Sequence, residues 1–214
     1  MLQKAPLWRS FLFAERENTM DLLQRCALEF TQLLDVQYHI IAGRKRKTVE
    51  FIISFERSDF HHLAGLHKLR DNARLQRGRR GDILQNILDG KITLEQIQKS
   101  AFFREMEPRL SPLSGLEQFL DSNEIIFRYN SKANAFSVIQ ADYLLENTWK
   151  GDSVYLFLSQ RRDEETQVCR TFFPKAGKDY TVGQPRYTLL RKEKVFLKTG
   201  ERVVQYDRLS PNPK

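Results

Sequence analysis

Cysteine, long apolar runs and metal-binding motifs are all scarce in this chain of 214 residues. The two cysteines, Cys26 and Cys169, are too few for a disulfide scaffold, and they stand in no metal-ligand spacing. The sequence also has no zincin-type pattern of histidine and glutamate and no acidic calcium loop. We therefore expect no bound metal and no other cofactor.

The hydropathy of the sequence indicates neither a membrane-spanning segment nor a secretory segment. No apolar run reaches the ~18 residues that a membrane helix needs, and Arg9 interrupts the short apolar segment 7–13. We expect no membrane association and a cytoplasmic location. The chain has no internal repeat, low-complexity tract or linker rich in proline and glycine, which favours one domain over residues 1–214 with loose termini at 1–15 and 207–214.

Acidic residues are outnumbered by basic ones, 27 to 35, which gives a net charge of +8. The excess lies in two clusters. The first is the run Arg44-Lys45-Arg46-Lys47, and the second consists of Lys68, Arg70, Arg74, Arg77, Arg79 and Arg80. Such clusters are typical of nucleic-acid contacts, because each neutralised phosphate releases condensed counterions. A solvated hairpin tip and a solvated loop are the alternative interpretations.

The order of the expected elements predicts an α+β protein. An amphipathic helix over 19–34 precedes two strand-like runs, 36–42 and 48–55. Several short helices follow in a helical insert over 72–122. Strands are then expected at 124–129, 135–139, 153–160, 167–173, 187–190, 192–197 and 203–206, whereas 143–149 fits either a strand or a helix. This segregation favours a curved antiparallel sheet with the N-terminal helix and the helical insert packed on one face.

Three of the four histidines occur in one segment, Phe60-His61-His62-Leu63-Ala64-Gly65-Leu66-His67-Lys68-Leu69-Arg70-Asp71. Its apolar residues recur every third position, which predicts one amphipathic helix. On that helix His61 and Lys68 project from nearly the same side, and His67, Arg70 and Asp71 share another. In the alternative of a strand and turn, His61 and His67 share a face. Histidines beside apolar runs are also often hydrogen-bonded packing residues.

The histidine segment contains the residue types that RNA cleavage needs. An imidazole with a pKa near ~6.5 transfers protons at neutral pH. Beside a cation it can deprotonate a ribose 2′-hydroxyl or protonate a leaving 5′-oxygen, and this reaction needs no metal. Three later polar segments, 169–175, 179–184 and 187–194, supply tyrosine, threonine, arginine and lysine that can stack on bases and hold phosphates. For Arg191 to Lys194, a solvated edge strand is the alternative.

A family resemblance rests on these same residues. The run Phe60-His61-His62-Leu63-Ala64-Gly65-Leu66-His67-Lys68-Leu69 occurs together with Phe172-Phe173-Pro174, Asp179-Tyr180-Thr181, Gly183-Gln184 and Tyr187-Thr188-Leu189-Leu190-Arg191-Lys192-Glu193-Lys194. This set resembles the phage-associated branch of the barnase/EndoU/colicin/RelE-like nucleases, the PBECR group, and most closely its fourth subfamily. The resemblance spans residues 19–197.

The resemblance implies an RNase-like BECR fold and metal-independent cleavage of RNA by 2′-hydroxyl attack. It further implies a toxin or a phage or mobile-element effector that acts on tRNA or mRNA, with an antitoxin or immunity protein as its partner. The catalytic residues that it indicates are His62, His67, Lys68, Thr188 and Lys192. The expected nucleic-acid-binding residues are His61, Arg70, Arg74, Arg77, Arg79, Arg80, Lys175, Tyr187 and Arg191.

Two other hypotheses remain compatible with the sequence. The chain could be a non-catalytic nucleic-acid-binding or regulatory protein on the same scaffold, with steeply salt-dependent binding. It could also be an inhibitor whose basic face binds an acidic protein.

Overall fold

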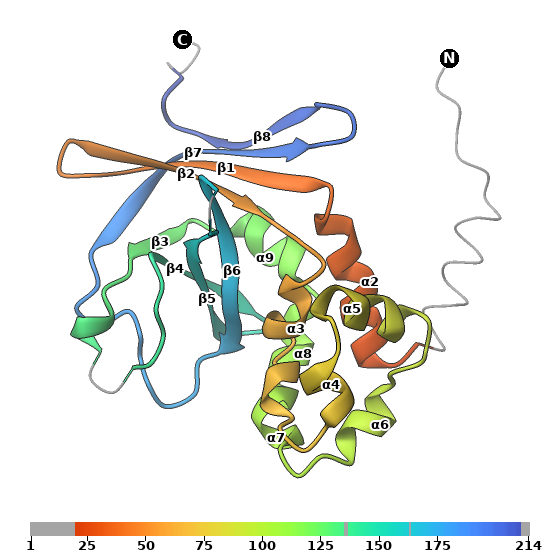
Figure 1. Cartoon of the computed structure of the whole chain (residues 1–214). Coiled ribbons are helices and arrows are strands. Elements are labelled where there is room, and N and C mark those ends of the chain that lie inside the picture. The colour runs from red at the N-terminus through yellow and green to blue at the C-terminus, as the bar shows by residue number, and fades with distance from the viewer. Residues whose placement is uncertain (1–19, 135–136, 163, 211–214) are drawn as a thin grey trace.

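A closed barrel forms the centre of the molecule. The computed structural model describes residues 20–134, 137–162 and 164–210. Within these ranges the strands are β1 (Val36–Arg44), β2 (Lys47–Ser54), β3 (Ile125–Arg128), β4 (Tyr143–Trp149), β5 (Asp152–Gln160), β6 (Thr166–Pro174), β7 (Arg186–Phe196) and β8 (Arg202–Asp207). They form one sheet in the order β1-β2-β6-β5-β4-β3-β7-β8, and β1 also pairs with β7. The first seven strands of that order therefore close a barrel, and β8 extends it from the edge of β7 (Figure 1).

The mixed α+β class agrees with the sequence prediction, but the curved antiparallel sheet is not confirmed. The sheet closes on itself, and its β2–β6 pair is parallel. Closure depends on β7, which runs unbroken through the region where two strands were expected. Its first residues pair with β3, and the residues from Thr188 onward pair with β1. A register shift between Ile41 and Ala42 adds the local bend that barrel strands commonly need.

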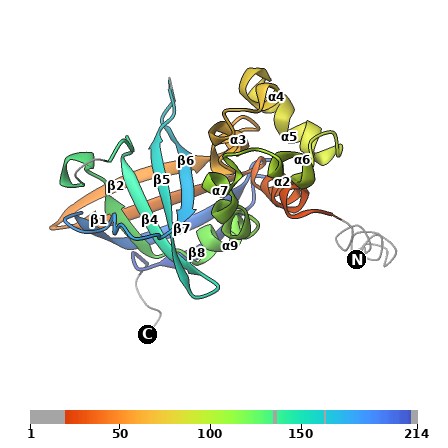
Figure 2. The same cartoon turned by 90° about the horizontal axis from the view of Figure 1, so that it is seen from below.

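The helices gather on one side of the barrel (Figure 2). Their bounds are α2 (Leu22–Leu33), α3 (Asp59–Leu63), η1 (Leu66–Lys68), α4 (Ala73–Arg77), α5 (Arg80–Leu88), α6 (Leu94–Gln98), α7 (Phe103–Met106), η2 (Glu107–Arg109), α8 (Leu110–Leu113) and α9 (Leu116–Ser122), and a short turn, η3 (Ser131–Ala133), lies beyond β3. The chain from 73 to 122 is thus helical, as expected, although its role as an insert within one domain stays a prediction. None of the described helices is long and apolar enough to cross a membrane.

Capping boxes mark where two of these helices, α2 and α6, begin. Asp21 accepts a hydrogen bond from Gln24 N, whose side chain returns to the Asp21 backbone, so α2 begins with a complete capping box. Thr93 and Gln96 form the same arrangement at α6. Both signals are visible in the sequence, because the capping residue and its partner are only three positions apart.

The main core joins the barrel interior to the helices. The apolar face of α2 packs with Tyr38, and the ring of Phe119 on α9 lies 5.1 Å from that of Phe172 on β6, at a near-perpendicular angle. A second, smaller cluster lies around Tyr155 and Phe157, and Tyr180 packs against it. These two clusters fix β6 between the helices and a loop and leave its last two residues, Phe173 and Pro174, partly exposed.

Segment 143–149, for which a strand and a helix were both expected as alternatives, is the strand β4. One expected strand, 135–139, differs from the structure. Residues 137–139 are not in a strand, and residues 135–136 of the same expected element lie outside the described residues. The expected loose termini cannot be compared in full, because 1–15 and 211–214 also lie outside them. Asp207 is the last residue of β8 and forms an ion pair with Arg191.

Candidate active site

Gly65 divides the histidine segment, so the single helix expected over 60–71 is wrong. Helix α3 ends at Leu63, and Gly65 adopts a φ of 74° before η1 begins at Leu66. A Cβ atom on Gly65 would lie 2.8 Å from Cδ of Arg109, so the site is both left-handed and crowded. The turn returns the chain toward α3. The expected alignment of His61 with Lys68 along one helix side is therefore wrong as well.

The turn brings three imidazoles together. The ring centroids of His62 and His67 are 4.9 Å apart, and those of His61 lie 5.5 Å and 6.3 Å from them. One nitrogen from each ring can be chosen so that all three lie within 4.8 Å of one another. His61 is 4 % exposed, and its Nε2 donates to the carbonyl of Leu75 at 3.2 Å. These three rings are the residues of this site that could hold a metal ion.

The environment of the cluster keeps its imidazoles neutral. Burial lowers the pKa of His62 to about 4, helped by the neighbouring ring of His67 and by the charge of Arg80. Burial also lowers the pKa of His67 to about 4, with Arg109 next in effect. The pKa of His61 is lowered as well, mainly by burial. At neutral pH each ring therefore has a lone pair available to accept a proton.

A pocket of about 690 Å³ opens beside His67 and Lys68. Strand β6 supplies Arg170, Thr171 and Phe173 to its wall, η2 supplies Arg109, and a loop supplies Tyr180. The pocket therefore combines a neutral imidazole with three cations and two aromatic rings. Cations suit phosphate groups, and aromatic faces suit stacked bases.

Arg109 is the most unusual cation of this pocket. It is 8 % exposed, donates from Nη1 to Thr171 Oγ1 at 2.7 Å and to the carbonyl of Phe172 at 3.2 Å, and lies over the ring of Phe173. It makes no ion pair with a carboxylate in the part of the chain that the structure describes, and burial lowers its pKa to about 10. A buried charge is costly unless it is paired. The guanidinium of Arg109 is thus available to pair with a bound anion.

Lys68 is the second cation close to His67. Its pKa is lowered, first by burial and then by Arg109, while Glu105 at 3.9 Å acts in the opposite direction. The lysine is therefore only partly paired. It stands directly beside the imidazole in sequence and in the pocket.

A comparison with known families identifies the family of the chain. Residues 22–209 match the family described as phage-Barnase-EndoU-ColicinE5/D-RelE like nuclease4, PBECR4. The chain belongs to this nuclease family. The resemblance inferred from the sequence is therefore confirmed, and a nucleic-acid substrate is the class that membership indicates. No curated protein and no solved structure gives a significant match to the chain.

Membership in the family does not identify the catalytic residues, so the position of each candidate matters. His61, His62, His67 and Lys68 lie together, as described above. Lys175 lies in sequence between two residues that line the same pocket, Pro174 and Ala176, but does not line it itself, and pairs with Asp179 at 2.6 Å. This pairing raises the pKa of Lys175. The sequence indicated segments 169–175 and 179–184, and both contribute to the pocket.

The second basic cluster follows the histidines on the outside of the helices. Arg70 pairs with Glu105 at 2.9 Å and lies over the ring of Phe102, and Arg74 donates to the carbonyl of Lys91. The side chains of Arg77, Arg79 and Arg80 are exposed around α4 and α5. Arg80 is close enough to the histidines to help lower the pKa of His62.

The candidates on β7 are not brought to the histidines. Tyr187 and Thr188 line a different pocket, of about 630 Å³, that shares no residue with the first. Lys192 is 2 % exposed, and its Nζ donates to the carbonyls of Leu120, Asp121 and Asn123, at and just beyond the end of α9. Burial lowers its pKa to about 8. This geometry is that of a lysine that closes a helix C-terminus.

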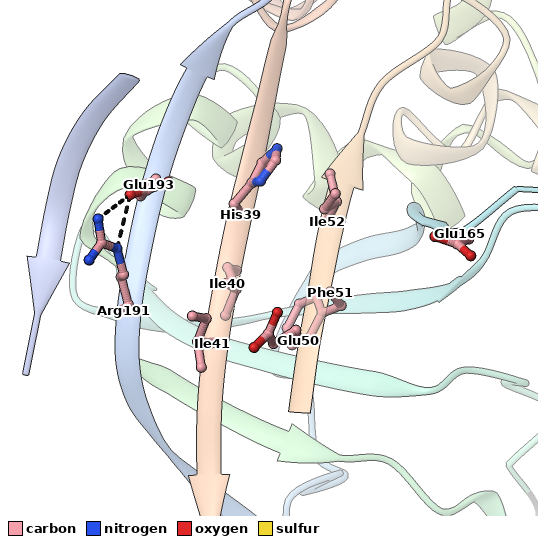
Figure 3. A pocket seen from close by; sticks show the side chains of 9 residues that line it. All are labelled: His39, Ile40, Ile41, Glu50, Phe51, Ile52, Glu165, Arg191 and Glu193. Atoms are coloured by element: carbon pink, nitrogen blue, oxygen red, sulfur yellow. Dashed lines mark hydrogen bonds and ion pairs between the residues drawn. The ribbon is translucent and has the colours of Figure 1, made fainter. Parts of the chain in front are cut away.

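Arg191 lies at a third place, beside a pocket of about 470 Å³ on the outside of β1, β2 and β7 (Figure 3). It donates to Glu193 from Nε and Nη2 and pairs with Asp207 at 3.2 Å. With two carboxylates around it, this guanidinium is already neutralised. The structure therefore separates Arg191, like Lys192, from the imidazole cluster.

Sequence reasoning missed Arg109, Arg170 and Tyr180 as individual site residues. Arg170 and Tyr180 fall in segments that were singled out, so their polarity was a usable signal. Arg109 follows Pro108 inside the helical region and carries no motif. Only packing against Gly65 and β6 reveals it.

Proposed function

We propose that this protein is a ribonuclease that cleaves RNA by attack of the ribose 2′-hydroxyl, with His67 as the general base. The observation that carries the proposal is a neutral imidazole at the wall of a pocket that also contains Lys68 and the unpaired, buried Arg109. A base must be deprotonated at working pH, and the lowered pKa of His67 meets that condition.

The proposed reaction has one proton acceptor and one proton donor. His67 removes the 2′-hydroxyl proton while O2′ forms a bond to phosphorus. The bond from phosphorus to O5′ breaks, and Lys68 protonates O5′, since both imidazoles are neutral in the free protein. The products are a 2′,3′-cyclic phosphate and a 5′-hydroxyl end. His62, 4.9 Å from His67 between ring centroids, can share the proton that His67 acquires.

Arg109 stabilises the extra negative charge of the phosphorane. Its position is fixed by Thr171 and Phe172, so little reorganisation is needed during the reaction. Phe173 and Tyr180 offer faces for the bases that flank the cleaved bond. Side chains thus supply both proton transfers and the charge stabilisation, which supports cleavage without a metal.

The biological setting of the proposal comes from the family resemblance. We extend it to a cytoplasmic toxin or phage effector that acts on tRNA or mRNA and has an antitoxin or immunity protein as its partner. The proposed catalytic set excludes Thr188 and Lys192, and the proposed RNA-binding set excludes Tyr187 and Arg191, because these residues lie in other pockets or already have partners.

The decisive experiment uses an RNA oligonucleotide and its matched variant with a single 2′-deoxyribose at the cleavage site, both in EDTA. We expect cleavage of the first with a 2′,3′-cyclic phosphate end and no cleavage of the second at that position. Equal cleavage of both would rule out 2′-hydroxyl attack. Steeply salt-dependent binding with intact RNA would instead favour the non-catalytic binding protein, which the exposed arginines of α4 and α5 support.

A further inference from the structure

We propose that His61, His62 and His67 form a binding site for one divalent transition-metal ion of the Zn²⁺ class. We further propose that the bound ion inhibits RNA cleavage by withdrawing His62 and His67 from proton transfer, a second step that rests on the proposed function. Three imidazoles with a fourth position open to solvent or anion form a common ligand set of zinc sites.

The hydrogen bonding of His61 carries the first argument. Because a carbonyl only accepts, the bond to Leu75 O places the proton of neutral His61 on Nε2. Nδ1 then has a free lone pair. It is buried and has no hydrogen-bond partner among the described residues. A carbonyl that orients one ring nitrogen and frees the other is the usual support of a metal-bound histidine.

His67 provides a second unpartnered ring nitrogen. Its Nδ1 is also buried and lacks a hydrogen-bond partner within the described ranges. Buried polar atoms without partners are uncommon, because each loses its hydration without compensation. Two of them in adjoining rings indicate a shared ligand, and a metal ion can accept both lone pairs at once.

The distances require only a modest contraction. One nitrogen of each ring can be chosen so that the three lie within 4.8 Å of one another, whereas ligands of tetrahedral zinc at about 2.0–2.1 Å from the metal are about 3.3 Å apart. His62 and His67 are half-buried, so their rings can turn toward buried His61. They also stand on opposite sides of the turn at Gly65, so small changes there alter their separation.

The charge around the cluster determines how tightly the ion is held. A metal ion binds imidazole in its neutral form. Arg80 and Arg109 lie close enough to the histidines to repel a cation bound there. They also favour an anionic fourth ligand. We therefore expect a reversible site, weaker than a structural zinc site, which suits an inhibitor.

Cobalt provides a direct test that does not involve RNA. The full chain, without a histidine tag, is titrated with Co²⁺ and followed by visible absorption. We expect a tetrahedral Co²⁺ spectrum that saturates at one equivalent and is removed by Zn²⁺. His62→Gln and His67→Gln should abolish it, while His39→Gln, which changes the remaining histidine on β1, should retain it. No saturable spectrum, or one that survives both cluster variants, would overturn the site.

The same preparations then test inhibition. In EDTA the wild type should cleave RNA, and one equivalent of Zn²⁺ over the chelator should reduce the rate at least tenfold. Cleavage unchanged by bound Zn²⁺, or seen only with Zn²⁺, contradicts the inhibitory step. No cleavage under any condition overturns the proposed function and the inhibition together, whereas the cobalt spectrum still decides whether the metal site exists.

Discussion

The imidazole rings of His62 and His67 lie 4.9 Å apart between centroids, with a tilt of 43°. Five positions separate the two residues, so a continuous helix would direct them to different faces. The left-handed turn at Gly65 brings them together instead. Much of the proposed chemistry depends on this one departure from helical geometry.

Replacing His67 by alanine should remove the general base. We expect His67→Ala to lower kcat by about 10²–10⁴-fold, the usual contribution of a positioned base. The protein should still fold, because the ring is only half-buried. His39→Ala is the matched control and should cleave like the wild type, since His39 lies on β1 near Gln37. Equal rates for the two variants would exclude His67 from the reaction.

The pH dependence of cleavage should reflect the lowered imidazole pKa. A base with a pKa of about 4 remains deprotonated at pH 5, so kcat/KM should stay near its maximum there and halve near pH 4. An imidazole of ordinary pKa would halve the rate near ~6.5. Initial rates in EDTA across this range provide the measurement, and half-maximal activity near 6.5 would contradict the assignment.

Stability must be followed across the same pH range. The pKa values of His62 and His67 are lower in the folded protein than in the unfolded chain, so between about 4 and 6.5 the unfolded chain binds more protons. The free energy of unfolding should therefore decrease as the pH falls through this window. Urea unfolding at each pH separates this loss from a change in catalysis.

Arg109→Met should separate anion binding from folding. It removes a buried, unpaired charge but leaves Thr171 and the carbonyl of Phe172 without their donor, and these effects on stability oppose each other. We expect a change of less than about 2 kcal/mol in the free energy of unfolding and a loss of about 10²–10³-fold in kcat.

Inorganic phosphate gives an independent readout of the same change. Phosphate should raise the Tm of the wild type and of Arg202→Met, an exposed control, but not that of Arg109→Met. If Arg109→Met keeps both the phosphate shift and the cleavage rate, Arg109 does not bind the anion.

Lys192 should be a structural residue rather than a catalytic one. Lys192→Met leaves three carbonyls near the end of α9 without their shared donor, and we expect the free energy of unfolding to fall by about 1–3 kcal/mol. At temperatures where the variant is folded, the cleavage rate should match that of the wild type. Lys198→Met, at an exposed lysine that pairs with Asp35, should change neither quantity. A large loss of cleavage rate in a stable Lys192→Met protein would instead show that Lys192 takes part in catalysis.

Local signals explain how much of the fold could be predicted. The capping boxes at Asp21 and Thr93, the β1–β2 hairpin around Lys45 and Arg46, and most strands follow from patterns within a few residues. Barrel closure was not predictable in this way. It depends on the pairing of β1 with β7 and of β2 with β6, which joins segments more than 100 residues apart.

The candidate site shows the same division. The sequence was sufficient to single out His62, His67 and Lys68, because their types and spacing are local. It could not distinguish Arg109 from other arginines or separate Lys192 from the site. Their roles depend on what packs around them, and burial is a property of the folded chain.

By itself the sequence determined the family, the basic character and the concentration of histidines in one segment. The tertiary structure decided which groups meet. The turn at Gly65 folds the segment back on itself, and packing against β6 buries Arg109 beside His67. The physical reason is that proton transfer, anion binding and metal binding all depend on distances of a few ångströms and on local exclusion of water, and the chain acquires both only on folding.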